Sequence, residues 1–196
     1  MGEIAAIRRF VRAPVGDRCD ACGSALAPDH EHRVHTIERR TECVCPTCAA
    51  RDPGGVFRRV RRHVTALGPV EGLSVDWDRL GIPVRIAFFV ASGDGGVTAF
   101  FPSPAGATQF HPSRQAWDDL RASSPAVAGM TPEVDALLVN HLGSAREQYV
   151  VSIDVCYELV GSVRRHWRGF SGGDDAWSAV ETILSTLRRE GAACPD

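Results

Sequence analysis

The sequence predicts an α+β fold in which a small cysteine-rich module precedes an antiparallel sheet with C-terminal helices. Five of the seven cysteines lie within residues 19–48, pairs of apolar segments separated by turn residues follow, and amphipathic segments close the chain. The turn-forming sequence "RDPGG" follows the last clustered cysteine. We therefore expect a module over residues 1–55 and an α+β domain over residues 56–196.

Four of the clustered cysteines form two C-x-x-C pairs, Cys19 with Cys22 and Cys45 with Cys48. This arrangement is typical of a zinc ribbon, in which two tight turns aim four sulfurs at one ion. Four thiolates fill a tetrahedral shell and leave no position for water or substrate, so the pattern predicts a structural Zn²⁺ site. Gly23 gives the first turn the conformational freedom that such turns often need.

The identity of the metal has alternatives that the sequence leaves open. A sulfur-only site also suits iron, either as a single ion in rubredoxin fashion or as an iron–sulfur cluster. Disulfides are disfavoured because the cysteine count of seven is odd and because no apolar N-terminal signal segment is present, which predicts a cytoplasmic protein. The longest apolar runs, such as "IAFFVA", are too short to cross a bilayer, so no membrane association is expected.

Four further residues between or beside the pairs are candidate ligands: Cys43, His30, His32 and His35. Cys43 could replace Cys45 in the sulfur set, although the C-x-x-C spacing favours Cys45, or it could be a free thiol beside the site. His30 and His32 would share one face of a strand, and His32 and His35 would suit a turn, so the histidines could complete a second site. The alternative is that the histidines lie in a solvated loop.

The middle of the chain predicts two β-hairpins. The segments 83–91 and 97–103 are rich in β-branched and aromatic residues and flank the turn sequence "SGDGG". The segments 134–142 and 147–153 flank "GSAR" in the same way. Two hairpins predict an antiparallel sheet rather than the parallel sheet of an alternating βαβ chain.

Three segments have the apolar spacing of amphipathic helices, at residues 113–123, 155–167 and 175–190. Asp174 is the expected N-cap of the last helix, and Gly191 is its expected C-terminal stop. We expect the helices to cover one face of the sheet.

The chain contains no lysine, because all twenty-two basic residues are arginine. Pyridoxal phosphate enzymes, Schiff-base enzymes, P-loop nucleotide hydrolases and protein kinases each need a lysine amine, which a permanently charged guanidinium cannot replace. The sequence also lacks the usual catalytic motifs of hydrolases and zinc proteases. The composition therefore favours a protein that is not an enzyme.

Arginines alternate with apolar residues in "IRRFVR" at 7–12 and in "FRRVRRH" at 57–63. Such patches raise the question of a nucleic-acid partner. The sequence pI of about 6.4 and the absence of a base-reading motif argue against it. An acidic protein partner would satisfy the same arginines.

Several longer segments carry a family resemblance, namely "LGIPVRIAFFV", "FFPSPAGAT", "VDALLV" and "SIDVCYELVGSVRRHWRGFSGG", together with the cysteine cluster. Over about residues 17–190 the chain resembles an uncharacterised, mainly actinobacterial family, a domain of unknown function often encoded beside nickel-iron hydrogenase subunit and maturation genes. The resemblance implies a hydrogenase accessory or assembly role, with a hydrogenase subunit or maturation factor as partner. The segments "TQFHPSRQAW" and "FRRVRRHV" depart from the family's usual pattern and leave open a paralogue in another pathway.

The sequence is therefore compatible with three functions. The first is a metal-binding accessory protein for a nickel-iron hydrogenase or a related metalloenzyme, with a structural, non-catalytic ion. The second is an electron-transfer protein in which the four paired cysteines hold iron or an iron–sulfur cluster. The third is a metal-dependent enzyme of specialised metabolism that uses Cys43 or the histidines as a catalytic shell.

Overall fold

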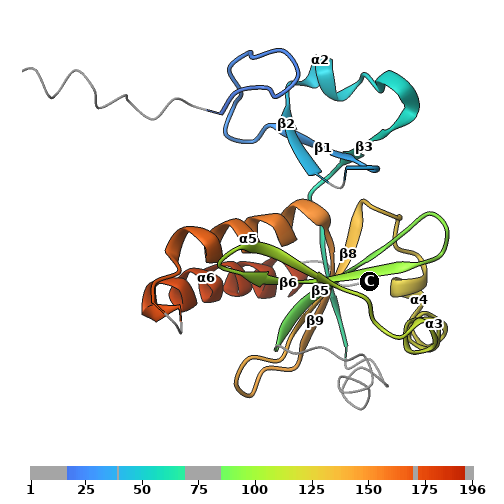
Figure 1. Ribbon diagram of the computed structural model, residues 1–196, viewed down its shortest axis with the longest axis vertical. Helices are drawn as coiled ribbons and strands as arrows, with labels where there is room; N and C mark the ends of the chain where they lie inside the picture. Colours follow the sequence, from blue (N-terminus) through green and yellow to red (C-terminus); the bar gives the residue numbers. More distant parts are fainter. Residues whose placement is uncertain (1–16, 39, 69–84, 170–171, 193–196) are drawn as a thin grey trace, which may run out of the picture.

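Two antiparallel sheets organise the chain, and Figure 1 shows the smaller one above the larger one. The computed structural model describes residues 17–38, 40–68, 85–169 and 172–192. The smaller sheet belongs to a module that contains the clustered cysteines, and the larger sheet belongs to a body with the C-terminal helices. The predicted α+β fold class is confirmed.

The small sheet has three strands in the order β2-β1-β3. Its strands are β1 (Glu31–His35), β2 (Arg40–Val44) and β3 (Phe57–Val60). Between β2 and β3 lie the short helix α2 (Pro46–Ala49) and the 3₁₀ turn η1 (Pro53–Gly55). The first strand is central because it pairs antiparallel with both of the others.

The third strand of this sheet follows the expected module boundary at residue 55. This strand, β3, pairs with β1 and completes the small sheet. It lies within the arginine-rich segment "FRRVRRH". Val60 at its end is buried, whereas Arg58 and Arg59 are exposed. The division of the chain at residue 55 stays a prediction from the sequence.

The large sheet has six strands in the order β4-β9-β8-β5-β6-β7. They are β4 (Val64–Leu67), β5 (Ile86–Ala91), β6 (Val97–Ser103), β7 (Gly106–Phe110), β8 (Asp135–Asn140) and β9 (Glu147–Ser152). Both predicted hairpins, β5 with β6 and β8 with β9, are confirmed. Pairing of β5 with β8 joins the hairpins, and the two outer strands β4 and β7 were not predicted.

The helices lie on both faces of the large sheet, which corrects the expectation of one covered face (Figure 1). The helices α5 (Ile153–His166) and α6 (Gly173–Ala192) pack on one face, and α3 (Arg114–Ser123) with α4 (Pro125–Ala128) packs on the other. The reason is visible in β5, where consecutive phenylalanines point to opposite faces and both are fully buried. A continuous apolar run is typical of a strand covered on both sides.

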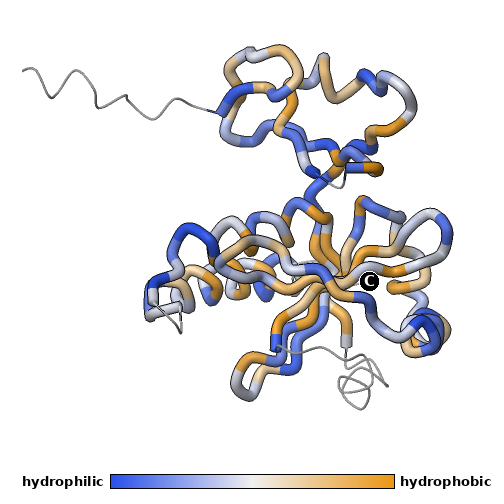
Figure 2. Tube along the Cα trace, in the orientation of Figure 1, coloured by the Kyte–Doolittle hydropathy of each residue, from blue (hydrophilic) through white to orange (hydrophobic). Residues whose placement is uncertain are grey.

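The two phenylalanines show how each face is filled. Phe88 stacks on Phe100 at a ring-centroid distance of 5.3 Å, in the core between the large sheet and the helices α5 and α6. Phe89 stacks on Trp117 of α3 at 6.1 Å in the opposite core. The strands at the centre of the body are coloured largely as hydrophobic in Figure 2, as a doubly covered sheet requires.

The ends of α6 differ from the predicted ones. Asp174 lies in the first turn of the helix, where its negative charge faces the helix N-terminus, and is not the N-cap. Gly191 is inside the helix, which ends at Ala192. A Cβ atom at Gly191 would lie 2.9 Å from the Cβ atom of Ala66 on β4, so this glycine permits the close approach of α6 to the sheet.

Candidate metal centre

The first cysteine pair lies on a tight turn. Cys19 and Cys22 belong to a loop that Gly23 closes, because the Gly23 N–H donates to the Cys19 carbonyl at 2.8 Å. Gly23 has a φ of 74°, in the left-handed region that disfavours side chains. The glycine after the second cysteine therefore has the conformational role that the sequence suggested.

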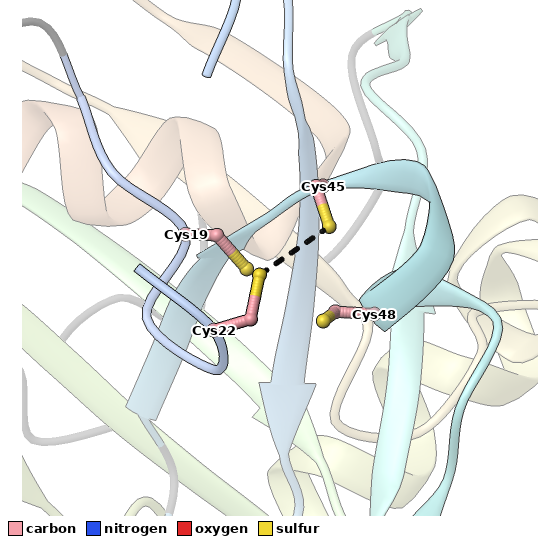
Figure 3. A group of neighbouring side chains, drawn as sticks. All are labelled: Cys19, Cys22, Cys45 and Cys48. Carbon is pink, nitrogen blue, oxygen red and sulfur yellow. Dashed lines mark hydrogen bonds between the residues drawn. The ribbon is translucent and has the colours of Figure 1, made fainter. Parts of the chain in front are cut away.

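The second cysteine pair uses the start of α2 to make an equivalent turn. Cys45 is the N-cap of this helix, and Pro46 is its first residue. The N–H groups of Cys48 and Ala49 both donate to the Cys45 carbonyl at 2.9 Å. This turn brings the Cys48 side chain to the same side as the Cys45 side chain (Figure 3).

The four sulfurs of the two turns point toward one another, as Figure 3 shows. The ligand atoms of Cys19, Cys22, Cys45 and Cys48 all lie within 4.8 Å of one another. The distance between Cys22 Sγ and Cys45 Sγ is 3.8 Å. In an ideal tetrahedron with metal–sulfur bonds of about 2.3 Å, the sulfurs are also about 3.8 Å apart, whereas a disulfide needs about 2.0 Å. This Cys₄ cluster could hold one metal ion.

Hydrogen bonds around the sulfurs favour ionisation of the first pair. Backbone N–H groups, the strongest that of Cys45, lower the pKa of Cys19 to about 6. The Ser24 hydroxyl lies 3.2 Å from the Cys22 sulfur and lowers the pKa of that thiol. The neighbouring sulfurs, first Cys22 and then Cys45, raise the pKa of Cys48 to about 12. A divalent cation bound by the four sulfurs would favour the ionised form of all of them.

A buried ion pair links the second turn to the small sheet. Arg33 on β1 and Glu42 on β2 lie opposite each other, are 5% and 6% exposed, and form an ion pair of 2.7 Å. The same guanidinium donates to the carbonyls of Cys48 and Arg51, each at 3.2 Å. Its Cζ atom lies 3.7 Å from the centre of the Phe57 ring on β3. One side chain thus connects all three strands with the turn that carries Cys48.

The first turn is attached to the same sheet through the backbone of Cys43. The Asp20 N–H donates to the Cys43 carbonyl at 2.9 Å, and the Cys43 N–H donates to the Asp20 carboxylate at 2.7 Å. These two bonds place the first turn beside the end of β2. The Cys43 side chain is not in the four-sulfur group, so the structure brings Cys45 rather than Cys43 to Cys19, Cys22 and Cys48.

The candidate histidines separate into two places. The ligand atoms of His30, His32 and Cys43 lie within 4.8 Å of one another, and His32 is directly opposite Cys43 in the pairing of β1 with β2. The His35 ring instead packs against Phe57, with the ring centroids 4.8 Å apart. His30, the residue before β1, lies on the same side of the hairpin as His32, as the sequence suggested, whereas His35 at the end of β1 faces the opposite side.

Asp154 is the residue near this second group that sequence reasoning missed. It lies in the first turn of α5, and its Oδ2 atom accepts from His32 Nδ1 at 3.1 Å. The hydrogen bond to Asp154 raises the pKa of His32. Burial acts to raise the pKa of Asp154, but the bonds from His32 and Ser152 outweigh it and lower that pKa. His32 and Asp154 are far apart in the chain, so no local pattern in the sequence indicated that they would be in contact.

Comparison with known proteins gives a family and no function. Residues 18–191 match a family of unknown function, DUF5947. No curated protein and no solved structure matches the chain. Among the helices that the structure describes, none combines the length and the apolar character that a membrane span needs.

The buried ion pair predicts a specific pattern of stability. Replacing Glu42 with Leu should lower the free energy of unfolding of the metal-loaded protein by about 3–5 kcal/mol, because Arg33 then keeps an uncompensated buried charge. The double variant Arg33→Met/Glu42→Leu should recover part of that loss. Glu38→Leu is the matched control, because its exposed pair with Arg40 contributes at most about 1 kcal/mol. Urea denaturation measures all three, and equal losses for the single and control variants would contradict this assignment.

Proposed function

The chain belongs to the DUF5947 family of unknown function, and we propose that it is a non-catalytic accessory protein whose Cys₄ cluster holds one structural Zn²⁺. The observation that carries the proposal is the convergence of the four paired sulfurs within 4.8 Å. Four protein ligands fill the tetrahedral shell of zinc, so no position is left for a substrate or a reactive water. The metal then stabilises shape and does not perform chemistry.

The size of the module explains why it would need the ion. The buried cluster around the metal centre consists of Cys19, Val44 and Cys48, two of which are ligands. A core this small cannot offset the conformational entropy lost when the two turns become ordered. In small metal modules of this kind, the free energy of metal binding is largely the free energy of folding.

We further propose that the module and body together dock on a protein partner in the cytoplasm. The resemblance of the sequence to proteins encoded beside hydrogenase genes suggests a nickel-iron hydrogenase subunit, one of its maturation factors, or a related metalloenzyme. A groove between β3 and the body is lined on one side by basic residues and on the other by Thr131, Val134 and Asp135. The basic residues are Arg58, Arg59, Arg61 and His63.

Charge pairing within the chain favours a protein partner over a nucleic acid. Arg59 pairs with Glu31, Arg58 lies 3.6 Å from Asp52, and Arg62 contacts Glu158 at 3.1 Å. Among the described residues, Arg61 is the arginine of this segment for which no ion pair is observed. Most of the positive charge is therefore neutralised locally, which suits a few acidic side chains better than a continuous phosphate backbone.

Metal analysis tests the structural site. Cys48→Ser and Cys22→Ser should each lose the tightly bound ion and expose the module to proteolysis, while the body keeps its helical circular dichroism. Cys156→Ala, at a buried cysteine of the body core, should keep the ion. Full retention of tightly bound metal in both serine variants would refute the ligand assignment. A colourless protein supports zinc, whereas visible thiolate-to-iron absorption would assign iron and the electron-transfer function.

The docking groove is tested by charge reversal. Arg61→Glu should weaken binding to a purified hydrogenase subunit or maturation factor by about tenfold, or about 1.4 kcal/mol, because an attractive contact becomes repulsive. Arg146→Glu makes the same charge change at an exposed position on the loop between β8 and β9 and is the control. Surface plasmon resonance measures both, and equal affinities for the two variants would remove the groove from the proposal.

A further inference from the structure

We propose that the chain holds a second divalent ion of the Zn²⁺ class, bound by His30 Nε2, His32 Nε2 and Cys43 Sγ, with its fourth position open to solvent. One ligand atom of each residue, a ring nitrogen or the sulfur, lies within 4.8 Å of those of the other two, and none of the three residues belongs to the Cys₄ cluster. The site lies where the module meets the body, because His32 also contacts Asp154 of α5.

The β1–β2 hairpin turns one face toward the Cys₄ cluster, where Val44 packs with Cys19 and Cys48, and the other face toward the second donor set. His32 and Cys43 are direct partners across the hairpin, and His30 lies two residues before His32, so the three side chains share one face. Arg33 and Glu42, at the adjacent paired positions, face the other way toward the second cysteine turn. Because side chains alternate between the two faces of a strand, the donor set with an open position lies on the face away from the Cys₄ cluster.

Hydrogen bonds fix the orientation of both imidazole rings. His30 Nδ1 lies 2.8 Å from the Ala27 carbonyl oxygen, which can only accept, so Nδ1 carries the hydrogen. His32 Nδ1 lies 3.1 Å from the Asp154 carboxylate, which imposes the same tautomer. In both neutral rings the lone pair is therefore on Nε2.

The two Nε2 atoms face each other at 3.2 Å, with the ring planes at 90°. With both rings neutral, two lone pairs at this distance repel each other, so the contact requires either a proton on one Nε2 atom or a cation beside both. A tetrahedral ion with metal–nitrogen distances of about 2.0–2.1 Å separates two imidazole nitrogens by about 3.3–3.4 Å. The observed separation is close to this value, so the rings need little movement to coordinate one ion.

The chemistry of the donors indicates the class of ion. Two imidazoles and one thiolate are borderline-soft ligands that suit Zn²⁺ and its spectroscopic substitute Co²⁺ better than Mg²⁺ or Ca²⁺. A carboxylate behind a coordinating histidine, here Asp154 behind His32, fixes the ring and strengthens the ligand. All three ligand residues are partly exposed, so water can reach the fourth position and the ion can exchange.

Metal counting on the full-length protein tests the second site. The protein is saturated with Zn²⁺ at micromolar free concentration and analysed by native mass spectrometry. We expect two ions per chain in the unaltered protein and one in His30→Ala and Cys43→Ser. The remaining ion should be the tightly bound Cys₄ ion, which distinguishes failure at this site from failure of the proposed structural site. His35→Ala is the control, because His35 is on the opposite face of the same strand, and it should keep two ions.

Two further measurements separate coordination from a general effect on folding. Co²⁺ added to protein with zinc in the Cys₄ cluster should give the visible bands of a tetrahedral ion with one thiolate, and Cys43→Ser should lose the sulfur charge-transfer band. Asp154→Asn should weaken binding of the second ion about 10- to 100-fold without loss of the first. One ion per saturated unaltered chain, or two ions in both His30→Ala and Cys43→Ser, would overturn the proposal.

Discussion

Mutual repulsion of four thiolates is the constraint on which the module depends. The sulfurs can approach as closely as they do in ionised form only around a cation, because each negative charge raises the cost of the next. Within this cluster, backbone N–H groups lower the pKa of Cys19, whereas hydrogen bonding with the neighbouring sulfurs raises the pKa of Cys48. The two turns, the central position of β1 and the Arg33–Glu42 pair all serve to bring these sulfurs to one point.

The module is also joined to the body, so the metal centre influences more than its own turns. Val34 of β1 and Val60 of β3 belong to the same hydrophobic core as α5 and α6. Arg62, between β3 and β4, contacts Glu158 of α5 and Glu190 of α6. Together with the His32–Asp154 bond, these contacts couple the β1–β2 hairpin, which lies beside both donor sets, to the helical face of the large sheet.

Local patterns in the sequence predicted the elements that local chemistry determines. The C-x-x-C spacing led to the four sulfurs, and "SGDGG" between apolar segments predicted the first hairpin, because turn geometry depends on neighbouring residues. The outer strands β4 and β7 were missed because each is short and depends on a partner for its conformation. The helices on the second face were missed because periodicity within α3 does not say which side of a sheet it will cover.

The residues of the candidate site also show that local sequence patterns do not predict contacts between distant segments. His30 and His32 were recognised as sharing a face from their spacing alone, whereas Asp154 joins them through the packing of α5 against the module. Arg33 and Glu42 become buried partners only through the register of the hairpin, and no local pattern in the sequence singled out either residue. Contacts between distant segments follow from the assembled fold, and a single sequence contains no local signal for them.

X-ray absorption at the metal edge of the tightly bound ion tests whether four sulfur atoms complete its coordination shell. The measurement uses full-length protein from which weakly held metal has been removed by gel filtration. We expect a zinc edge and a first shell of four sulfur atoms at about 2.3 Å. A nitrogen or oxygen ligand in that shell would mean that the centre has an exchangeable position, and it would contradict a purely structural ion.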